Sequence, residues 1–383
     1  MHICVIPPSY PNKYNPQSSI FVYELCKALS MRDNRVTVLD SGLYTIKHWT
    51  DKSCWILQKE KDEYQTIYRF HTPLVFRSFF KRTGILLAFL RISKMFRRLI
   101  KEDKLPDVIY AHFSYPSGVA AARISKKYKI PLAFEEHAGR FLEPNVSQFY
   151  CNVLRYVTNS SKCIIAVSSS LAEKIEKMTL KKTLIVPNLI DDRFQYYKSV
   201  SKKKFVFFSA GNLVKIKNMD LLIKAFAEAF NDINDVELRI AGDGPERTNL
   251  LKIIEDQQLQ NKVTLLGRLD REEILSQYIY SDAFALLSGH ETFGVAFRES
   301  LAVGRPVVTS ENQGMLEDWQ EEFGIMVPIG NISQSAKALK EMYINLEKYN
   351  GKLISSIVCQ RYAASSVSEK VERILSQVSK MEV

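Results

Sequence analysis

Long apolar runs are missing from this sequence of 383 residues: none reaches the roughly 18 residues that a membrane-spanning helix requires. The first residues lack the basic segment and apolar stretch of a secretory signal peptide, and none is predicted. The six cysteines are scattered and show no C-x-x-C spacing. A chain of this length can bury a large core without disulfides or structural metal ions. These absences together predict a protein of the reducing cytoplasm.

Three sequence motifs are also absent. No G-x-G-x-x-G follows the first predicted strand, which argues against a dinucleotide-dependent dehydrogenase. No D-x-D triplet occurs anywhere, so an aspartate-held metal ion on a diphosphate has no support, and no metal site is predicted. The basic residues stand in no helix-turn-helix or RNP-like context, and we predict no nucleic-acid partner.

The positive charge is confined to one half of the chain. Residues 1–200 contain 31 Lys and Arg against 17 Asp and Glu, a net charge of +14. Residues 201–383 contain 22 against 25, a net charge of −3. Such asymmetry indicates an anionic partner, such as a membrane leaflet or a charged glycan. The alternative is a basic surface without a specific partner.

The segment 79–101 has the spacing of a basic amphipathic helix. Its apolar residues recur at helical intervals: Ile85, Phe89, Ile92, Phe96 and Leu99. Its basic residues are predicted to share the opposite face: Arg91, Lys94, Arg98 and Lys101. A helix of this kind can lie in a membrane interface, which would make the protein peripheral on the inner face of the plasma membrane. It can also pack its apolar side on the core of its own domain, and the two interpretations are compatible.

Strands and helices alternate along both halves of the chain. In the first half, strands are predicted at 2–7, 35–40, 107–112, 131–136 and 162–168, with a helix at 20–29 following the first strand. In the second half, the strand 205–211 is followed by a helix at 219–230 and a strand at 236–241. This order predicts the α/β class with two doubly wound domains. The predicted domains are 1–198 and 199–365, followed by a C-terminal helix within 366–383.

The most informative stretch runs from Ser288 to Val308. It follows an apolar strand and contains a loop, a short helix that begins after Gly294, and the start of another strand. Ligands bind at such places in open α/β sheets, outside the carboxyl ends of the strands. The amides of Phe293, Gly294 and Val295 are predicted to meet a phosphate at the helix N-terminus. The carboxylates of Glu291 and Glu299 can accept hydrogen bonds from sugar and ribose hydroxyls, and phosphate plus hydroxyls together describe a nucleotide sugar.

The run Glu291-Thr-Phe-Gly, then Glu299, then Gly304-Arg-Pro-Val-Val308 resembles the nucleotide-sugar signature of the family 4 retaining glycosyltransferases. The resemblance implies the GT-B fold, in which two Rossmann-like domains face a central cleft. It implies that the first domain binds the acceptor and the second binds a UDP- or GDP-sugar donor, without a metal ion or other cofactor. It also implies that the C-terminal helix returns to the first domain.

The resemblance assigns roles to several further residues. His137, at the end of a predicted strand, occupies the place of a histidine near the donor sugar, and with Glu291 it is a candidate catalytic residue. Ser18 and Ser19 stand where the family has a glycine, near the acceptor and the donor phosphates. Lys217 matches a lysine that holds the donor diphosphate. Asn212 replaces the arginine that usually accompanies this lysine, which places the second phosphate contact in doubt.

These inferences predict a cytoplasmic, membrane-peripheral glycosyltransferase of cell-surface polysaccharide synthesis, acting on a glycan or lipid-linked acceptor. The resemblance implies transfer with retention, in which the departing phosphate helps to deprotonate the acceptor. Two alternatives remain. One is a GT-B sugar-nucleotide epimerase or phosphorylase, and the other is a catalytically silent scaffold that docks on membranes.

Overall fold

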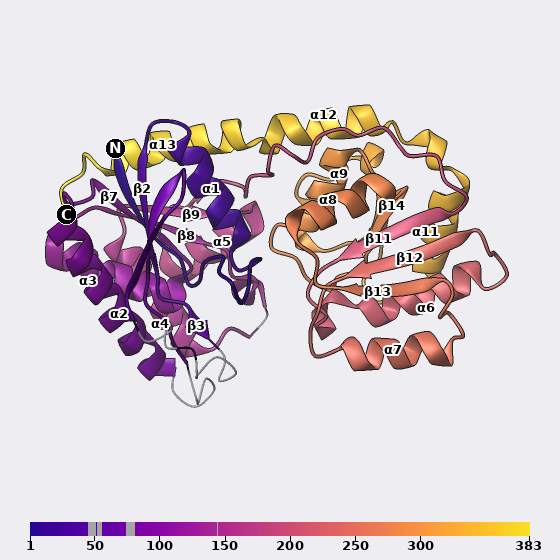
Figure 1. Cartoon of the computed structure of the whole chain (residues 1–383), viewed down its shortest axis with the longest axis horizontal. Helices are drawn as coiled ribbons and strands as arrows, with labels where there is room; N and C mark the ends of the chain where they lie inside the picture. Colours follow the sequence, from indigo (N-terminus) through magenta and orange to yellow (C-terminus); the bar gives the residue numbers. More distant parts are fainter. Residues whose placement is uncertain (45–50, 52–55, 74–80, 144) are drawn as a thin grey trace. The chain divides into compact units, whose positions relative to one another are not determined.

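The computed structural model describes residues 1–44, 51, 56–73, 81–143 and 145–383. The chain divides into two compact units, one formed by Met1–Leu189 with Ala364–Val383 and the other by Ile190–Ala363 (Figure 1). Cys54 and residues 79 and 80 of the predicted basic helix lie outside the described residues.

An eight-stranded sheet forms the centre of the first unit. Its strands lie in the order β10 (Leu184–Ile185), β9 (Cys163–Ala166), β8 (Leu132–Glu136), β7 (Val108–His112), β1 (His2–Ile6), β2 (Arg35–Asp40), β5 (Gln65–Arg69) and β4 (Gln58–Lys61). All neighbouring strands whose pairing is described are parallel except β4 and β5, which form an antiparallel edge. A separate short pair joins β3 (Leu43–Tyr44) to β6 (Thr72–Pro73). Continuous apolar runs such as Ile3–Ile6 form these central strands because both faces of the sheet are covered.

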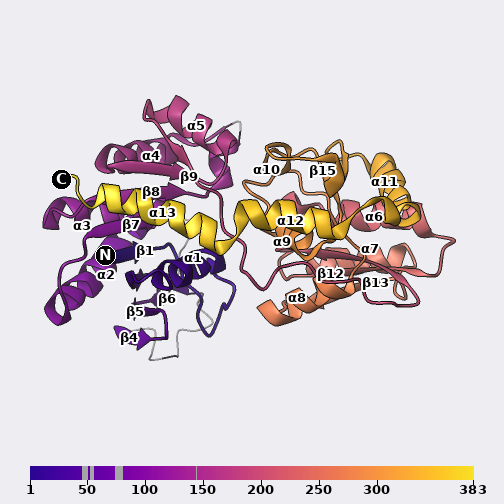
Figure 2. The ribbon, with the colours of Figure 1, turned by 90° about the horizontal axis from the view of Figure 1, so that it is seen from above.

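Helices cover both faces of this sheet (Figure 1). They are α1 (Ile20–Ser30), α2 (Lys81–Glu102), α3 (Val119–Tyr128), α4 (Gln148–Ser160), α5 (Ser169–Thr179) and α13 (Ala364–Val378), with the short turns η3 (Ser114–Gly118) and η4 (Gly139–Leu142). The helices α1 and α13 lie side by side on one face, which both ribbon views show (Figure 2). The helices α2, α3 and α4 pack together on the other.

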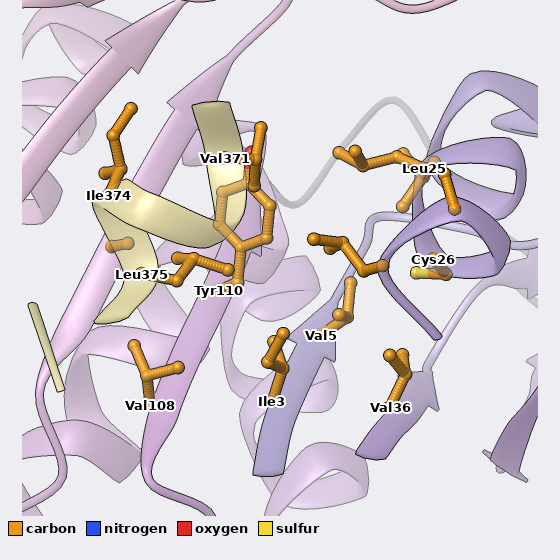
Figure 3. Packing of buried hydrophobic residues seen from close by; sticks show 14 of the residues in the cluster. Ile3, Val5, Leu25, Cys26, Val36, Val108, Tyr110, Val371, Ile374 and Leu375 are labelled. Carbon is orange, nitrogen blue, oxygen red and sulfur yellow. The ribbon is translucent and has the colours of Figure 1, made fainter. Parts of the chain in front are cut away.

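The C-terminal helix α13 is part of the core of the first unit. Its apolar residues Val367, Val371, Ile374, Leu375 and Val378 are buried against β1, β2, β7 and α1. Figure 3 shows Val371 and Leu375 beside Tyr110 of β7, with Ile3 and Val5 of β1 next to them. At its solvent side, Glu372 accepts hydrogen bonds from Arg32 and Asn34, which fixes the helix to the loop after α1.

A six-stranded parallel sheet forms the centre of the second unit. Its order is β13 (Val263–Gly267), β12 (Val236–Ala241), β11 (Phe205–Ala210), β14 (Ala283–Leu286), β15 (Val307–Ser310) and β16 (Gly324–Val327). The helices are α6 (Met219–Phe230), α7 (Arg247–Asp256), α8 (Arg271–Tyr280), α9 (Val295–Val303), α10 (Gln313–Leu316), α11 (Ile332–Ile344) and α12 (Gly351–Tyr362). Short turns are η5 (Lys215–Lys217), η6 (Glu321–Phe323) and η7 (Leu346–Lys348).

Along the sequence, the boundaries between the units lie at 189/190 and 363/364. The boundaries predicted from the sequence are 198/199 and 365/366. The segment 190–198 belongs to the second unit because it packs there. The amide of Ile190 donates to the carbonyl of Tyr362 at 2.9 Å, and Phe194 is fully buried. Arg305 donates from Nη1 to the carbonyl of Tyr197 at 2.8 Å. The polar, basic segment 199–204 therefore directly precedes β11 and is not the point at which the chain passes from the first unit to the second.

The helix α2 differs in one respect from the predicted basic face. Arg91 is only 4% exposed, and burial lowers its pKa to about 10. The exposed side carries Leu86, Leu90, Lys94, Arg97 and Lys101, whereas Arg98 is half-buried and pairs with Glu102 at 2.6 Å. The prediction that Arg91 lies on the solvent side is wrong. Neighbouring elements cover a wider part of the helix surface than the spacing of the basic residues indicated, and Arg91 lies within the covered part. None of the helices in the described residues is long and apolar enough to span a bilayer.

Each sheet contains a point at which the strand order reverses. In the first unit the reversal lies between β1 and β7, and in the second it lies between β11 and β14. Loops that leave the carboxyl ends of such strands diverge to opposite faces of the sheet, which leaves room for a ligand between them. Most of the site residues predicted from the sequence lie in loops at the carboxyl ends of the strands of these two sheets.

Candidate active site

Two loops meet at the strand-order reversal of the second sheet. Lys217 follows β11 and Glu291 follows β14, and Lys217 Nζ lies 2.5 Å from Glu291 Oε1. Both side chains are partly buried, with 21% and 11% of their surface exposed. Both residues were predicted from the sequence, but their contact with each other was not. The structure therefore brings the candidate diphosphate lysine and the candidate sugar carboxylate together.

Backbone and amide hydrogen bonds fasten these two loops to each other. The side-chain amide of Asn218 donates to the carbonyl of Leu287 at 3.0 Å. The amide of Gly289 donates to the carbonyl of Ile216 at 2.9 Å. The Lys217–Glu291 pair therefore joins two loops whose backbones already have fixed positions, which lowers the entropy cost of holding the side chains in place.

The helix α9 begins directly after Gly294, as the sequence predicts. Gly294 is its N-cap residue, with a φ of 75°, so the first helical residue is Val295. The amides of Val295, Ala296 and Phe297 lie in the first turn and have no partner within the helix, so Val295 is the predicted phosphate contact that belongs to this turn. A Cβ on Gly294 would lie 2.9 Å from Cδ2 of Phe297, so the glycine suits both the left-handed backbone and the close packing.

Phe293 and Gly294 precede the first turn of α9, and the side chain of Phe293 is buried against Tyr362.

A buried arginine fixes the position of the first turn of α9. Arg298 is 3% exposed, and it donates from Nη1 to the carbonyl of Phe293 and from Nη1 and Nη2 to that of Gly314. Its Nη2 also lies 2.6 Å from Oδ1 of Asp318. Arg298 thus connects the start of α9 to α10, and it was not predicted from the sequence.

Glu299 lies one helical turn into α9 and has two protein partners. Its Oε1 accepts a hydrogen bond from Nη1 of Arg271 at 2.6 Å. The hydroxyl of Tyr278 lies 3.4 Å from its Oε2 and donates to the carbonyl of Ala296 at 2.8 Å. Glu299 is 4% exposed, so a ligand would reach only the face of the carboxylate that Arg271 and Tyr278 leave open. Neither partner could be identified from the sequence, because both lie on α8, about twenty to thirty residues earlier.

The three remaining phosphate candidates have different surroundings. Asn212, after β11, is exposed. Ser18 and Ser19 lie in the loop after β1 in the first unit, where the hydroxyl of Ser18 donates to that of Ser9 at 2.7 Å. Oγ of Ser19 is 3.3 Å from Oγ of Ser9. Ser19 is the N-cap of α1 with a left-handed backbone and no side-chain capping hydrogen bond. The hydroxyls of all three serines therefore form a small polar group, of which Ser9 was not predicted.

His137 is held at the end of β8 by the residue that precedes it. Oε1 of Glu136 accepts hydrogen bonds from the amides of His137 and Ala138, both at 3.0 Å. Its Oε2 accepts from the amide of Ser114 at 3.0 Å, which joins the loop after β8 to the loop after β7. The imidazole packs against the rings of Phe21 and Phe113, at centroid distances of 4.7 and 5.0 Å.

A second histidine contacts the first. Nδ1 of His112 lies 3.0 Å from Nε2 of His137, and a carboxyl oxygen of Glu135 lies 3.6 Å from Nδ1 of His112. Burial lowers the pKa of His137 well below its usual value, and the neighbouring His112 lowers it further, against a smaller opposing effect of Asn188. Burial also lowers the pKa of His112 to about 3. Both rings are therefore neutral at physiological pH.

A cavity of about 570 Å³ adjoins His137 in the first unit. Phe113, Arg140 and Tyr150 are among its lining residues, and the guanidinium of Arg140 lies 4.3 Å from the centre of the Tyr150 ring. The cavity is large enough for a sugar or a small polar group. His137 therefore has space for a ligand on one side and His112 on the other.

Comparisons with known proteins agree with this arrangement. Residues 191–377 match the family model of glycosyl transferases group 1, and residues 18–194 match the model of Glycosyltransferase Family 4. The N-acetyl-alpha-D-glucosaminyl L-malate synthase of Bacillus anthracis is 23% identical over 291 residues, which cover 71% of this chain and 75% of that protein. The alpha-D-kanosaminyltransferase of Streptomyces kanamyceticus is 22% identical and covers 77% of this chain and 82% of that protein.

Solved structures show the same architecture. Sucrose-phosphate synthase of Thermosynechococcus elongatus superposes with a TM-score of 0.80 at 17% identity, over 99% of both chains. HepE of Anabaena, in complex with UDP and glucose, superposes with a TM-score of 0.76 at 19% identity, over 98% of this chain and 100% of that chain. The two α/β sheets and these neighbours define the GT-B fold. Since the two family models together cover nearly the whole chain, the protein belongs to the family 4-type glycosyltransferases and is related to bacterial sugar transferases.

Proposed function

We propose that this glycosyltransferase transfers a hexosyl group, with retention, from a nucleoside-diphosphate sugar to a glycan or lipid-linked acceptor in cell-surface polysaccharide synthesis. The observation that carries the proposal is the contact of Lys217 with Glu291 at the strand-order reversal of the second sheet. A cation and a carboxylate fixed side by side there suit a ligand that contains both a diphosphate and sugar hydroxyls.

The second unit is proposed to bind a UDP- or GDP-sugar. Lys217 and the free amides of the first turn of α9 meet the negative charge of the diphosphate. Glu291 accepts hydrogen bonds from hydroxyls of the sugar, and Glu299 from hydroxyls of the ribose. The structures of HepE with UDP and glucose support a uridine nucleotide as the first donor to test. In this proposal the leaving diphosphate needs neither a metal ion nor another cofactor.

The reaction is proposed to take place on one face of the donor sugar. The bond between the anomeric carbon and the diphosphate oxygen breaks, and the acceptor oxygen bonds to the same carbon from the same side. The acceptor's proton passes to the departing phosphate oxygen. Lys217 stabilises the charge that develops on that phosphate. His137, neutral because of its lowered pKa, offers its Nδ1 to a hydroxyl of the donor sugar.

The acceptor is proposed to bind to the first unit, close to Ser18, Ser19 and the cavity beside His137. The exposed side of α2 is proposed to rest on an anionic membrane leaflet, with Lys94, Arg97 and Lys101 near the headgroups. Leu86 and Leu90 on the same side are 51% and 54% exposed and would enter the interface. This arrangement suits a lipid-linked acceptor.

The test is a screen of UDP-, GDP- and ADP-sugars in two steps. The first step measures the melting temperature, which a bound donor raises by mass action. The second step measures nucleotide release from each stabilising donor, with and without membrane extracts that contain acceptors. Acceptor-dependent release with product of retained configuration supports the proposal. Interconversion of the donor sugar without an acceptor would identify an epimerase, phosphate-dependent release would identify a phosphorylase, and absence of any turnover would leave a membrane-docking scaffold.

A further inference from the structure

Three metal-ligating side chains converge at the ends of β7 and β8. In the register of this parallel pair, His112 lies directly opposite Glu135. His137 follows Glu135 by two residues, so its side chain returns to the same side of the extended chain. All three residues are buried. The topology of the sheet thus brings two imidazoles and one carboxylate to a single place.

The distances within this group suit a metal ion. One ligating atom from each residue lies within 4.8 Å of the other two. Nδ1 of His112 is 3.0 Å from Nε2 of His137 and 3.6 Å from Oε2 of Glu135, and Nε2 of His137 is 3.9 Å from Oε1 of Glu135. In a tetrahedral zinc site with metal–ligand bonds of about 2.0–2.2 Å, the ligating atoms are separated by about 3.3–3.5 Å. The observed separations lie on both sides of that value, so small side-chain rotations would suffice.

The carboxyl group of Glu135 is buried, and no lysine or arginine of the described residues forms an ion pair with it. The adjacent Glu136 is also fully buried. A divalent cation would supply the positive charge that this buried carboxylate lacks. The hydroxyl of Tyr110 donates a hydrogen bond to Oε2 of Glu135, as groups behind metal-bound carboxylates do.

We propose that His112, Glu135 and His137 form a binding site for a divalent transition-metal ion of the zinc type. The ligating atoms are Nδ1 of His112, Nε2 of His137 and a carboxylate oxygen of Glu135, and Tyr110 orients the carboxylate. Two imidazoles and one carboxylate are ligands that such ions accept, and three protein ligands leave a fourth coordination position. Without the ion, the two histidines share the 3.0 Å hydrogen bond instead.

The three proposed ligands belong to the first unit, whereas the proposed partners of the donor diphosphate belong to the second, and this proposal does not rest on the proposed function. Ligation through Nε2 of His137 fixes the proton of that ring on Nδ1. Nδ1 forms no hydrogen bond of its own to the described residues. The ion would therefore determine the tautomer of a histidine that lines the cavity.

The first experiment measures metal affinity by calorimetry, with Zn²⁺ added to the metal-free full chain. We expect one equivalent to bind, and we expect Glu135→Gln and His112→Asn each to weaken binding at least about 100-fold, since even a residue behind a ligand changes affinity by about 10–100-fold. Tyr110→Phe should weaken it by about tenfold. His71→Gln is the matched control, because His71 is also a buried histidine beside a buried carboxylate, Asp40. It should leave the affinity unchanged.

The second experiment needs no variant, so it is independent of whether the substitutions fold. X-ray absorption of the Zn²⁺-loaded wild-type chain should show two imidazole ligands and oxygen ligands, and Co²⁺ in its place should give the intense visible absorption of a four-coordinate ion. Failure of Zn²⁺ to bind overturns the proposal. Binding with sulfur ligands, or binding that Glu135→Gln and His112→Asn leave unchanged in folded protein, places the ion elsewhere and also overturns it.

Discussion

Lys217 and Glu291 form an ion pair, with Nζ and Oε1 2.5 Å apart. They follow the two strands between which the order of the second sheet reverses. A donor that binds there must exchange this contact for contacts of its own, with the diphosphate on the lysine and sugar hydroxyls on the carboxylate. The pair therefore holds both groups in position before the ligand arrives, which reduces the ordering cost of binding.

Replacing Lys217 by Ala is expected to lower kcat by about 100-fold or more, because the leaving diphosphate loses its fixed counter-charge. The measurement is turnover at saturating donor. Lys215→Ala is the matched control, since Lys215 belongs to the same short turn and is exposed. Equal turnover of the two variants would show that Lys217 has no role in the reaction.

Replacing Glu299 by Gln is expected to weaken nucleotide binding by about 1.5–3 kcal/mol, because hydrogen bonds to a charged group contribute about that much. Glutamine keeps the size of the side chain and can still accept a hydrogen bond from Arg271. The affinity for UDP or GDP can be measured by calorimetry. Glu272→Gln serves as a control, because Glu272 is an exposed glutamate next to Arg271 in sequence. Unchanged affinity in folded Glu299→Gln would remove Glu299 from the donor site.

Changing Lys94, Arg97 and Lys101 together to Gln is expected to weaken binding to phosphatidylglycerol vesicles by about 3 kcal/mol, at roughly 1 kcal/mol for each charge. High salt should reduce the difference, because it screens exposed charges. Co-sedimentation at low and high salt measures both effects. The control changes Lys126, Lys127 and Lys129 to Gln, which removes the same charge from exposed positions at the end of α3. If wild type stays in the supernatant at low salt, or if both triple variants behave alike, α2 is not a membrane-binding face.

Replacing His2 by Gln is expected to make stability less sensitive to acid. Burial lowers the pKa of His2 from 6.5 to about 4, with a smaller effect of Arg35. The unfolded chain therefore takes up a proton near pH 6.5, whereas the folded chain resists it until about pH 4. The stability from this residue is complete above pH 6.5 and falls by up to about 3 kcal/mol as the pH decreases to 4. Urea unfolding at pH 7.5 and 4.5 compares the two chains, and an equal loss in both would contradict the expectation.

Much of the site followed from where strands end. Glu291 and His137 were predicted in part because each follows an apolar run, and the carboxyl ends of parallel strands lie on one edge of their sheet. Lys217 was predicted from its match to a lysine of the resembled family. The glycine at 294 marked the start of a helix, and α9 begins directly after it. Local spacing and backbone preference are sufficient for predictions of this kind.

Contacts between distant segments were not predictable in this way. Arg271 and Tyr278 reach Glu299 from another helix, and Glu135 meets His112 through strand register. Arg91 has the spacing of an exposed residue, but the neighbours of α2 cover it. In each case the surroundings of the side chain depend on which helices and strands pack together. The packing of distant segments cannot be read directly from a single sequence. The two-stranded edge of β4 and β5 was missed for the same reason.

The return of α13 to the first unit determines the order in which a newly made chain can fold. Five apolar side chains between Val367 and Val378 complete the core around β1 and α1. The second unit is continuous in sequence from Ile190 to Ala363, whereas the first gains part of its core only from α13, which follows the whole of the second unit. Domains generally fold as units during synthesis, with the N-terminal domain first. In this protein the second unit is synthesised in full before the segment that completes the core of the first.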